Sequence, residues 1–123
     1  MAGAGVIHIA WYATVARHER FAALVAEVCP LALRYGATRY AVHQSQDDRY
    51  KILQMIWFES ESDWHRFWDG PDMIAFRRRN MGLYQVPITY NFYGELADGA
   101  LGPEVPTEPE GEPEPEPTPQ AAA

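Results

Sequence analysis

The chain has 123 residues, the usual length of one domain, and a formal net charge of −7 at neutral pH. Six glutamates and no lysine or arginine follow Pro103, so the rest of the chain is nearly neutral and lacks the basic face of a nucleic-acid binder. One cysteine, Cys29, excludes an internal disulfide framework. No apolar run approaches the roughly 20 residues that span a bilayer, and the first 15 residues show no secretory signal, so we expect a cytoplasmic protein without a membrane partner.

The first half of the chain predicts a strand, a helix and a strand. Residues 5–13 alternate Ile7, Ile9 and Trp11 with more polar positions, which is typical of a half-buried strand. Residues 16–35 place apolar side chains at helical spacing up to Gly36, and Pro30 should split this helix after about three turns. A second strand is expected over 38–45.

The second half repeats this order. A third strand over 50–59 follows the polar turn 46–48, close enough to the second strand for a hairpin. Ser60 and Asp63 resemble a capping box at the start of a helix. The sequence Asp69-Gly70-Pro71 should break that helix and restart it. The last strand is expected over 88–96.

The predicted order, βαββαβ, gives a ferredoxin-like α+β fold with a four-stranded antiparallel sheet and helices on one face. Strands three and four are apolar or aromatic on both faces, and one helical layer covers only one of them. We therefore expect a homodimer that packs sheet against sheet, because soluble monomers avoid large exposed apolar patches. The domain is predicted to span residues 5–97.

Residues 98–123 contain proline, glutamate, glycine and threonine but no aromatic residue. Such a segment cannot bury enough apolar surface to fold, so it is predicted to be a disordered acidic tail. Its function is open between a solubilising spacer and a segment that docks on a protein partner, or on the arginines at 77–79.

Over residues 5–96 the chain resembles the dimeric α+β barrel superfamily, and within it the antibiotic-biosynthesis-monooxygenase-like domains. The resemblance rests on element order and on the segments MIWFESESDWHRFWDGPDMIAFRRRN and VPITYNFYGEL. It implies a cofactor-free oxygenase, or an isomerase, that acts on a phenolic, quinol or polyketide-like aromatic compound. A haem-degrading activity is not implied, because the first strand has no asparagine and Arg78 stands where that branch has a histidine, ten residues after Trp68.

The candidate catalytic residues are His8, His43 and Arg78. Histidine is the side chain best suited to take a proton near neutral pH, and both histidines lie on strands that are not expected to be neighbours. At least one arginine of 77–79 should face solvent while another could hold an oxyanion, and we assign that role to Arg78. Structural roles at the rim of the sheet remain the alternative for the histidines.

The candidate substrate-binding residues are aromatic, and the same side chains could instead simply fill the core. No metal-ligand spacing is present, and no cofactor is expected. A non-catalytic ligand-binding or assembly module is the alternative function. The candidate binding residues are Trp11, Trp57, Trp64, Trp68, Tyr90 and Tyr93.

Overall fold

A computed structural model of the chain describes residues 4–102, so most of the predicted acidic tail lies outside the described residues. Residues 98–102 have no regular secondary structure. The elements in chain order are β1 (Gly5–Tyr12), α1 (His18–Val28), the 3-10 helix η1 (Cys29–Tyr35), β2 (Ala37–Gln44), β3 (Lys51–Phe58), α2 (Glu61–Trp68), α3 (Pro71–Arg79) and β4 (Thr89–Gly94).

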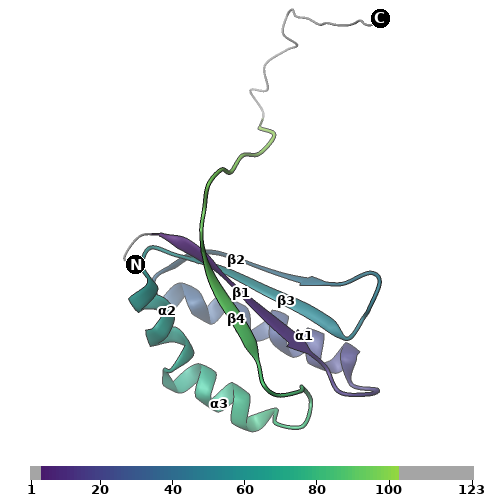
Figure 1. The fold of residues 1–123 in the computed structure, drawn as a ribbon. Helices are drawn as coiled ribbons and strands as arrows, with labels where there is room; N and C mark the ends of the chain where they lie inside the picture. Colours follow the sequence, from purple (N-terminus) through teal and green to yellow (C-terminus); the bar gives the residue numbers. More distant parts are fainter. Residues whose placement is uncertain (1–3, 103–123) are drawn as a thin grey trace, which may run out of the picture.

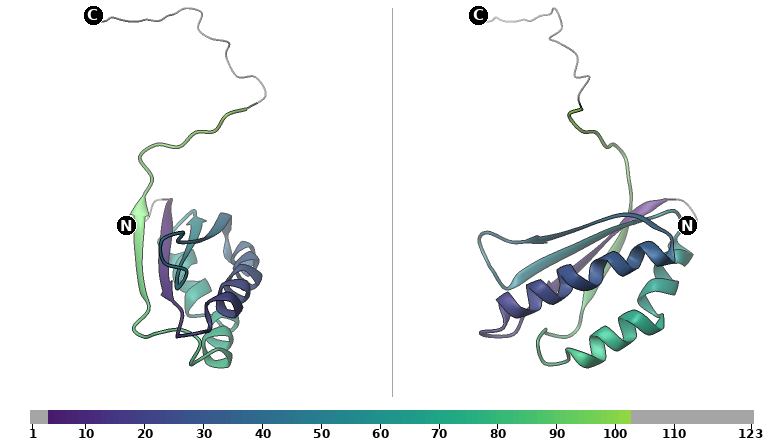
Figure 2. Two further views of the ribbon diagram at one scale, coloured as in Figure 1. Left: turned by 90° about the vertical axis from the view of Figure 1, so that its right-hand side faces the viewer. Right: turned by 180° about the vertical axis from the view of Figure 1, so that it is seen from behind.

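The four strands form one antiparallel sheet in the order β2-β3-β1-β4 (Figure 1). All helices lie on one face of this sheet, and the other face is open in the single chain (Figure 2). The predicted ferredoxin-like α+β architecture is confirmed. We call the face away from the helices the outer face.

The first helix divides where the sequence predicts. Helix α1 ends at Val28, and η1 continues from Cys29 with Pro30 in its first turn. Proline removes one backbone donor and its ring clashes with the preceding turn, so the regular α-helix cannot run through it. Gly36 ends η1 with φ of 99°, a left-handed conformation that favours glycine.

The second helical segment follows the predicted capping and break signals. The Ser60 hydroxyl accepts a hydrogen bond from the Asp63 backbone N–H at 3.3 Å and so caps α2. Helix α2 ends at Trp68, and α3 begins at Pro71 after Gly70. This interruption turns α3 relative to α2 (Figure 1). Both helices bury apolar side chains in the core.

The core lies between the helices and the sheet. β3 alternates buried and half-buried side chains along its length, which identifies its helix-facing positions. One of these positions holds Gln54, which is fully buried. The core rings and aliphatic chains beside it include Ile7, Ile9, Trp11, Phe21, Ile56, Phe58, Trp64, Phe67 and Phe76.

Candidate functional site

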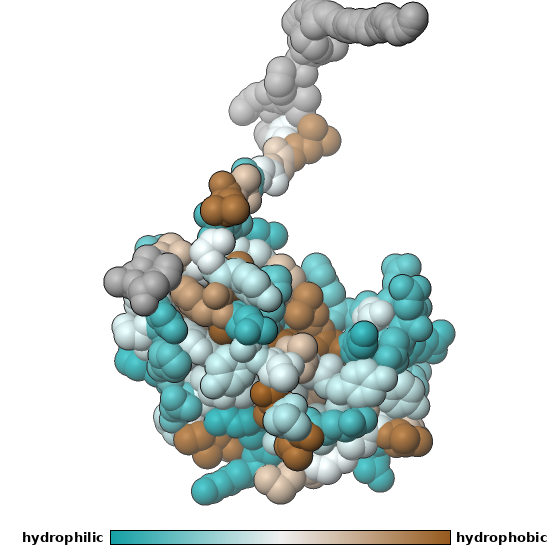
Figure 3. All heavy atoms as spheres, in the orientation of Figure 1, coloured by the Kyte–Doolittle hydropathy of each residue, from teal (hydrophilic) through white to brown (hydrophobic). Residues whose placement is uncertain are grey.

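The outer face carries a row of apolar and aromatic side chains that no helix covers. Trp57, Val6 and Tyr93 lie side by side on β3, β1 and β4 by strand register, at the end of the sheet where the chain leaves β4. Met55 and His8 form the next row. Figure 3 views this face and shows hydrophobic side chains in its middle, between hydrophilic margins. The outer face is therefore too apolar to be an ordinary solvated sheet surface.

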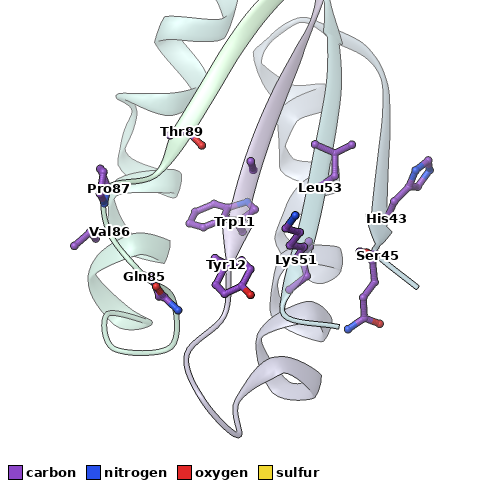
Figure 4. A pocket seen from close by; sticks show the side chains of 13 residues that line it. Trp11, Tyr12, His43, Ser45, Lys51, Leu53, Gln85, Val86, Pro87 and Thr89 are labelled. Atoms are coloured by element: carbon purple, nitrogen blue, oxygen red, sulfur yellow. The ribbon is translucent and has the colours of Figure 1, made fainter. Parts of the chain in front are cut away.

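A hollow of about 590 Å³ lies at the other end of the outer face. It is formed where β1 ends and β3 begins, and the segment Gln85–Pro87 before β4 lies along its other side (Figure 4). Leu53 and Lys51 lie in its middle, and His43 lies at its β2 edge. Its volume falls within the range of small-molecule sites. Its lining includes Ala10, Tyr12, His43, Lys51, Leu53 and Val86.

The hydroxyl of Tyr12 donates a hydrogen bond to Asp48 Oδ2 at 2.6 Å. This bond raises the pKa of Tyr12 and lowers the pKa of Asp48, because it stabilises the protonated phenol and the ionised carboxylate together. Tyr12 therefore stays neutral at physiological pH, and it lines the hollow as an uncharged polar ring. Lys51 pairs with Tyr12 across β3 and β1 and brings a positive charge to the same end of the sheet.

The two predicted catalytic histidines both lie on the outer face, but they lie apart. β3 separates their strands, as expected from the sequence. His43 is exposed at the hollow, and within residues 4–102 it makes no hydrogen bond or ion pair. His8 is half-buried two positions along β1 from the hollow, with its ring 4.7 Å from the ring of Tyr93.

Four predicted substrate-binding residues lie on the opposite side of the sheet. Trp11 and Trp64 are 2% and 1% exposed, and Trp68 is also buried. The ring of Trp64 stacks on that of Trp68, with 5.2 Å between the ring centres. The half-exposed ring of Tyr90 contacts both of them at the edge of the core. These rings fill the space between helices and sheet. The remaining two, Trp57 and Tyr93, lie on the outer face.

The three arginines at the end of α3 also lie on the helix side. Arg78 and Arg79 are exposed, and Arg77 turns inward so that its guanidinium lies 4.1 Å from the centre of the Trp68 ring. Nη1 of Arg77 is buried and finds no hydrogen-bond partner among residues 4–102. Partial burial lowers the pKa of Arg77. Arg77 turns inward, whereas the predicted catalytic arginine, Arg78, is exposed on the helix side of the sheet.

The structure thus divides the predicted site residues between two faces, because side chains alternate along a strand. His8 and Trp11 are three positions apart on β1 and must point in opposite directions. Tyr12 and Lys51 are not among the site residues predicted from the sequence. The alternation of side chains along a strand could have indicated them. Tyr12 lies an even number of positions from His8 on β1, and Lys51 lies an even number of positions from Leu53 and Trp57 on β3, so each shares a face with those residues.

Within residues 4–102, no three histidine, cysteine or acidic side chains gather into a group that could hold a metal ion. The helices in that range are too short and too polar to cross a bilayer.

Comparison of the sequence with models of protein families finds no match, and comparison with curated proteins finds none. Solved structures are similar. One is a Nitrosomonas europaea protein provisionally named an antibiotic biosynthesis monooxygenase, with a TM-score of 0.69 at 16% identity over 78% of this chain and 93% of that one. A Bordetella bronchiseptica protein with the same provisional name has a TM-score of 0.68 at 18% identity, over 77% of this chain and 99% of that one.

A third similar structure is SnoaB from Streptomyces nogalater, described as a cofactor-independent oxygenase. It gives a TM-score of 0.63 at 14% identity over 84% of this chain and all of that one. The chain has the fold of these proteins. The resemblance drawn from the sequence is confirmed at the level of fold, and identities this low establish nothing further about activity.

Proposed function

We propose that this chain binds a small phenolic or quinol-type aromatic compound in the hollow of its outer face and promotes the reaction of that compound with O₂. The observation that carries the proposal is the hollow itself, which combines an apolar floor at Leu53 and Ala10 with His43 and Lys51. An apolar cleft with a few polar groups is the usual form of a small-molecule site. The cofactor-independent oxygenase of the same fold supports the choice of chemistry.

The residues of the hollow suit each part of such a compound. Leu53, Ala10 and the ring of Tyr12 provide apolar surface for a flat ring. The ammonium group of Lys51 attracts an acidic hydroxyl or its anion. His43 is the titratable base at the rim, since an imidazole takes up a proton near neutral pH.

The reaction proposed for an anthrone-type compound needs only O₂ as oxidant. His43 removes a proton from the activated CH₂ group, and Lys51 stabilises the negative charge that forms on the conjugated oxygen. The carbanion gives electrons to O₂, and a carbon–oxygen bond forms. The peroxide takes the proton back from His43, and the same carbon then loses its second hydrogen as a proton while the O–O bond breaks. One oxygen atom stays in the new carbonyl, and the other leaves as water. The organic compound is oxidised and O₂ is reduced, so no further reductant is required.

The outer face also supports a homodimer. Leu53 and Met55 present apolar surface on the central strand β3, and Trp57 continues it toward one end. A second sheet packed on this face would remove that surface from water and would exclude water from the hollow. The dimer is part of the proposal, because a carbanion that reacts with O₂ must be kept from bulk solvent.

The test is O₂ consumption with an anthrone and with a quinol as probes. His43→Ala should lower the rate by about 10²-fold or more if His43 is the base. His65→Ala is the matched control, because His65 is an exposed histidine on α2 that faces Glu61 and lies away from the hollow. Equal rates for the wild-type chain and His43→Ala would contradict the proposal.

A second candidate function is binding without catalysis, and one observation favours it. His43 has no partner within the described residues to hold its imidazole in place, whereas catalytic bases are usually oriented by a third group. This alternative predicts saturable quenching of tryptophan fluorescence by the anthrone, weakened in Lys51→Met, with no O₂ consumption. O₂ consumption that depends on His43 would exclude it.

A further inference from the structure

The eight residues after β4, Glu95–Gly102, form a segment that we call the C-terminal arm. Beyond Glu95 it runs away from the end of the sheet (Figures 1 and 2). Leu96 is 100% exposed and Leu101 is 87% exposed. Figure 3 shows hydrophobic side chains along this arm, apart from the body of the molecule.

Two exposed leucines on one short arm need an explanation. Burying a leucine is worth roughly 1.5–3 kcal/mol, so an arm that carries two of them gains by docking on apolar surface. The single chain offers such surface on the outer face, where Leu53, Val86 and Ala10 border the hollow.

The start of the arm is fixed on the outer face. Trp57 donates its indole N–H to Glu95 Oε1 at 3.1 Å. Trp57 and Tyr93 lie at one end of the outer face, which we call the aromatic end. The hollow lies at the opposite end of the sheet, near Thr89 and Lys51. The arm of one chain therefore begins at the end of the outer face that is farthest from its own hollow.

Two copies can stack their outer faces around a two-fold axis that lies between the sheets and runs perpendicular to the strands. This axis reverses the strand direction of the second copy, so opposite ends of the two outer faces lie over each other. It places the aromatic end and the arm of one chain above the hollow end of the other. Closed dimers with such isologous contacts are the commonest assemblies of identical chains. Eight extended residues reach about 26–29 Å, enough to cross the width of a small sheet.

Charge favours the same arrangement. The arm carries Glu95 and Asp98, whereas the hollow carries Lys51 and His43 and the Asp48 carboxylate near it is bound by Tyr12. Asp98 of one chain would meet Lys51 of the other, and the leucines would meet Leu53 and Val86. Complementary charges of this kind fix register between two surfaces.

We propose that the C-terminal arm of each chain closes the hollow of a second copy, so that each ligand site is built from two chains. This inference rests on the dimer of the proposed function and adds the segment that completes the site. Leu96 and Leu101 supply the apolar cover, and Asp98 supplies the charge that faces Lys51.

The first test measures the dimer in the full chain by sedimentation equilibrium. Leu96→Ser together with Leu101→Ser should raise the dimer dissociation constant about tenfold or more. The matched control is Leu33→Ser together with Met81→Ser, two exposed apolar residues outside the outer face, which should leave it unchanged. An unchanged dissociation constant in the arm variant, or a wild-type chain that stays monomeric, would overturn the inference.

The second test locates the arm by cross-linking. Chains with Leu101→Cys are mixed with chains with Val86→Cys and treated with a short bismaleimide. Cys29 does not interfere because it is buried and its thiol has a pKa raised to about 11. A covalent heterodimer is expected from this mixture, and none from Leu33→Cys with Val86→Cys. A product of single-chain mass from the double variant Val86→Cys/Leu101→Cys, without the heterodimer, would show the arm on its own hollow and would overturn the inference.

The two proposals fail separately. If the arm variants keep the wild-type dimer while His43→Ala still abolishes O₂ consumption, the ligand site stands and the arm does not close it. If the heterodimer forms while no probe is consumed or bound, the arm docks on the outer face and the proposed function is wrong.

Discussion

Trp11 donates its indole N–H to Gln54 Oε1 at 2.8 Å in the centre of the core, and both side chains are almost completely buried. Gln54 Nε2 in turn donates to the Cys29 sulfur at 3.4 Å. These polar contacts join β1, its neighbour β3 and the first turn of η1 on the helix side of the sheet. Buried polar groups that are satisfied in this way are costly to leave unpaired.

Gln54→Met tests this contact, because methionine keeps most of the volume and removes the acceptor. The unpaired Trp11 N–H should lower the free energy of unfolding by about 1–3 kcal/mol. Urea denaturation measures this free energy of unfolding. Gln46→Met, at an exposed position in the turn before β3, should change it by less than about 0.5 kcal/mol. Equal stability of the two variants would show that the buried contact contributes nothing.

Cys29 predicts a pH dependence at alkaline pH. Burial raises the pKa of its thiol from 9.0 to about 11, with the hydrogen bond from Gln54 acting in the opposite direction. The unfolded chain releases this proton first, so the thiol's contribution to stability is complete below pH 9 and is lost as the pH rises toward 11. Urea denaturation between pH 8 and pH 11 should show a steeper loss for the wild-type chain than for Cys29→Ala. Parallel curves would contradict the assignment.

The neighbouring arginines 77 and 78 should differ in their contribution to stability. Arg77 packs its guanidinium on Trp68, whereas Arg78 faces solvent. Arg77→Ala should therefore cost about 1 kcal/mol through the lost stacking and the lost packing of its aliphatic stem. Arg78→Ala should stay within about 0.5 kcal/mol of wild type. Thermal unfolding followed by circular dichroism compares them, and a larger effect at Arg78 would reverse the assignment.

Ser60 should be required as the cap of α2. Ser60→Ala removes the acceptor for the Asp63 N–H and should lower the free energy of unfolding by about 1 kcal/mol. Ser60→Asp keeps an acceptor at the same position and should restore most of the loss. If the aspartate variant is as unstable as the alanine variant, the capping bond is not the cause.

A chain that ends at Gly102 tests the predicted tail separately from the arm. It lacks the glutamate- and proline-rich segment but keeps Leu96 and Leu101. If that segment is a spacer, dimer mass and melting temperature should match those of the full chain. A lower melting temperature at low salt, absent at high salt, would instead indicate docking on the arginines of α3.

Local signals in the sequence were sufficient for the elements and their order. Pro30 and Gly36 set the end of the first helix, Ser60 starts the second, and Gly70-Pro71 divides it, because each acts through its own backbone geometry or a neighbouring N–H. The apolar and aromatic residues at successive positions of β3 and β4 also predicted that both faces of the sheet are apolar. These features depend on contacts a few residues apart, so the chain order alone encodes them.

Only the tertiary structure decided which candidate residues meet. Trp11, Trp64 and Trp68 pack together as core, while His43 meets Lys51 and the end of β1 from three different strands. Arg77 rather than Arg78 turns inward because the rotation of α3 about its axis is set by how Met73 and Phe76 pack on the core. Strand order, register and helix rotation arise from contacts between distant segments, so the sequence by itself determined the elements and the structure determined the site.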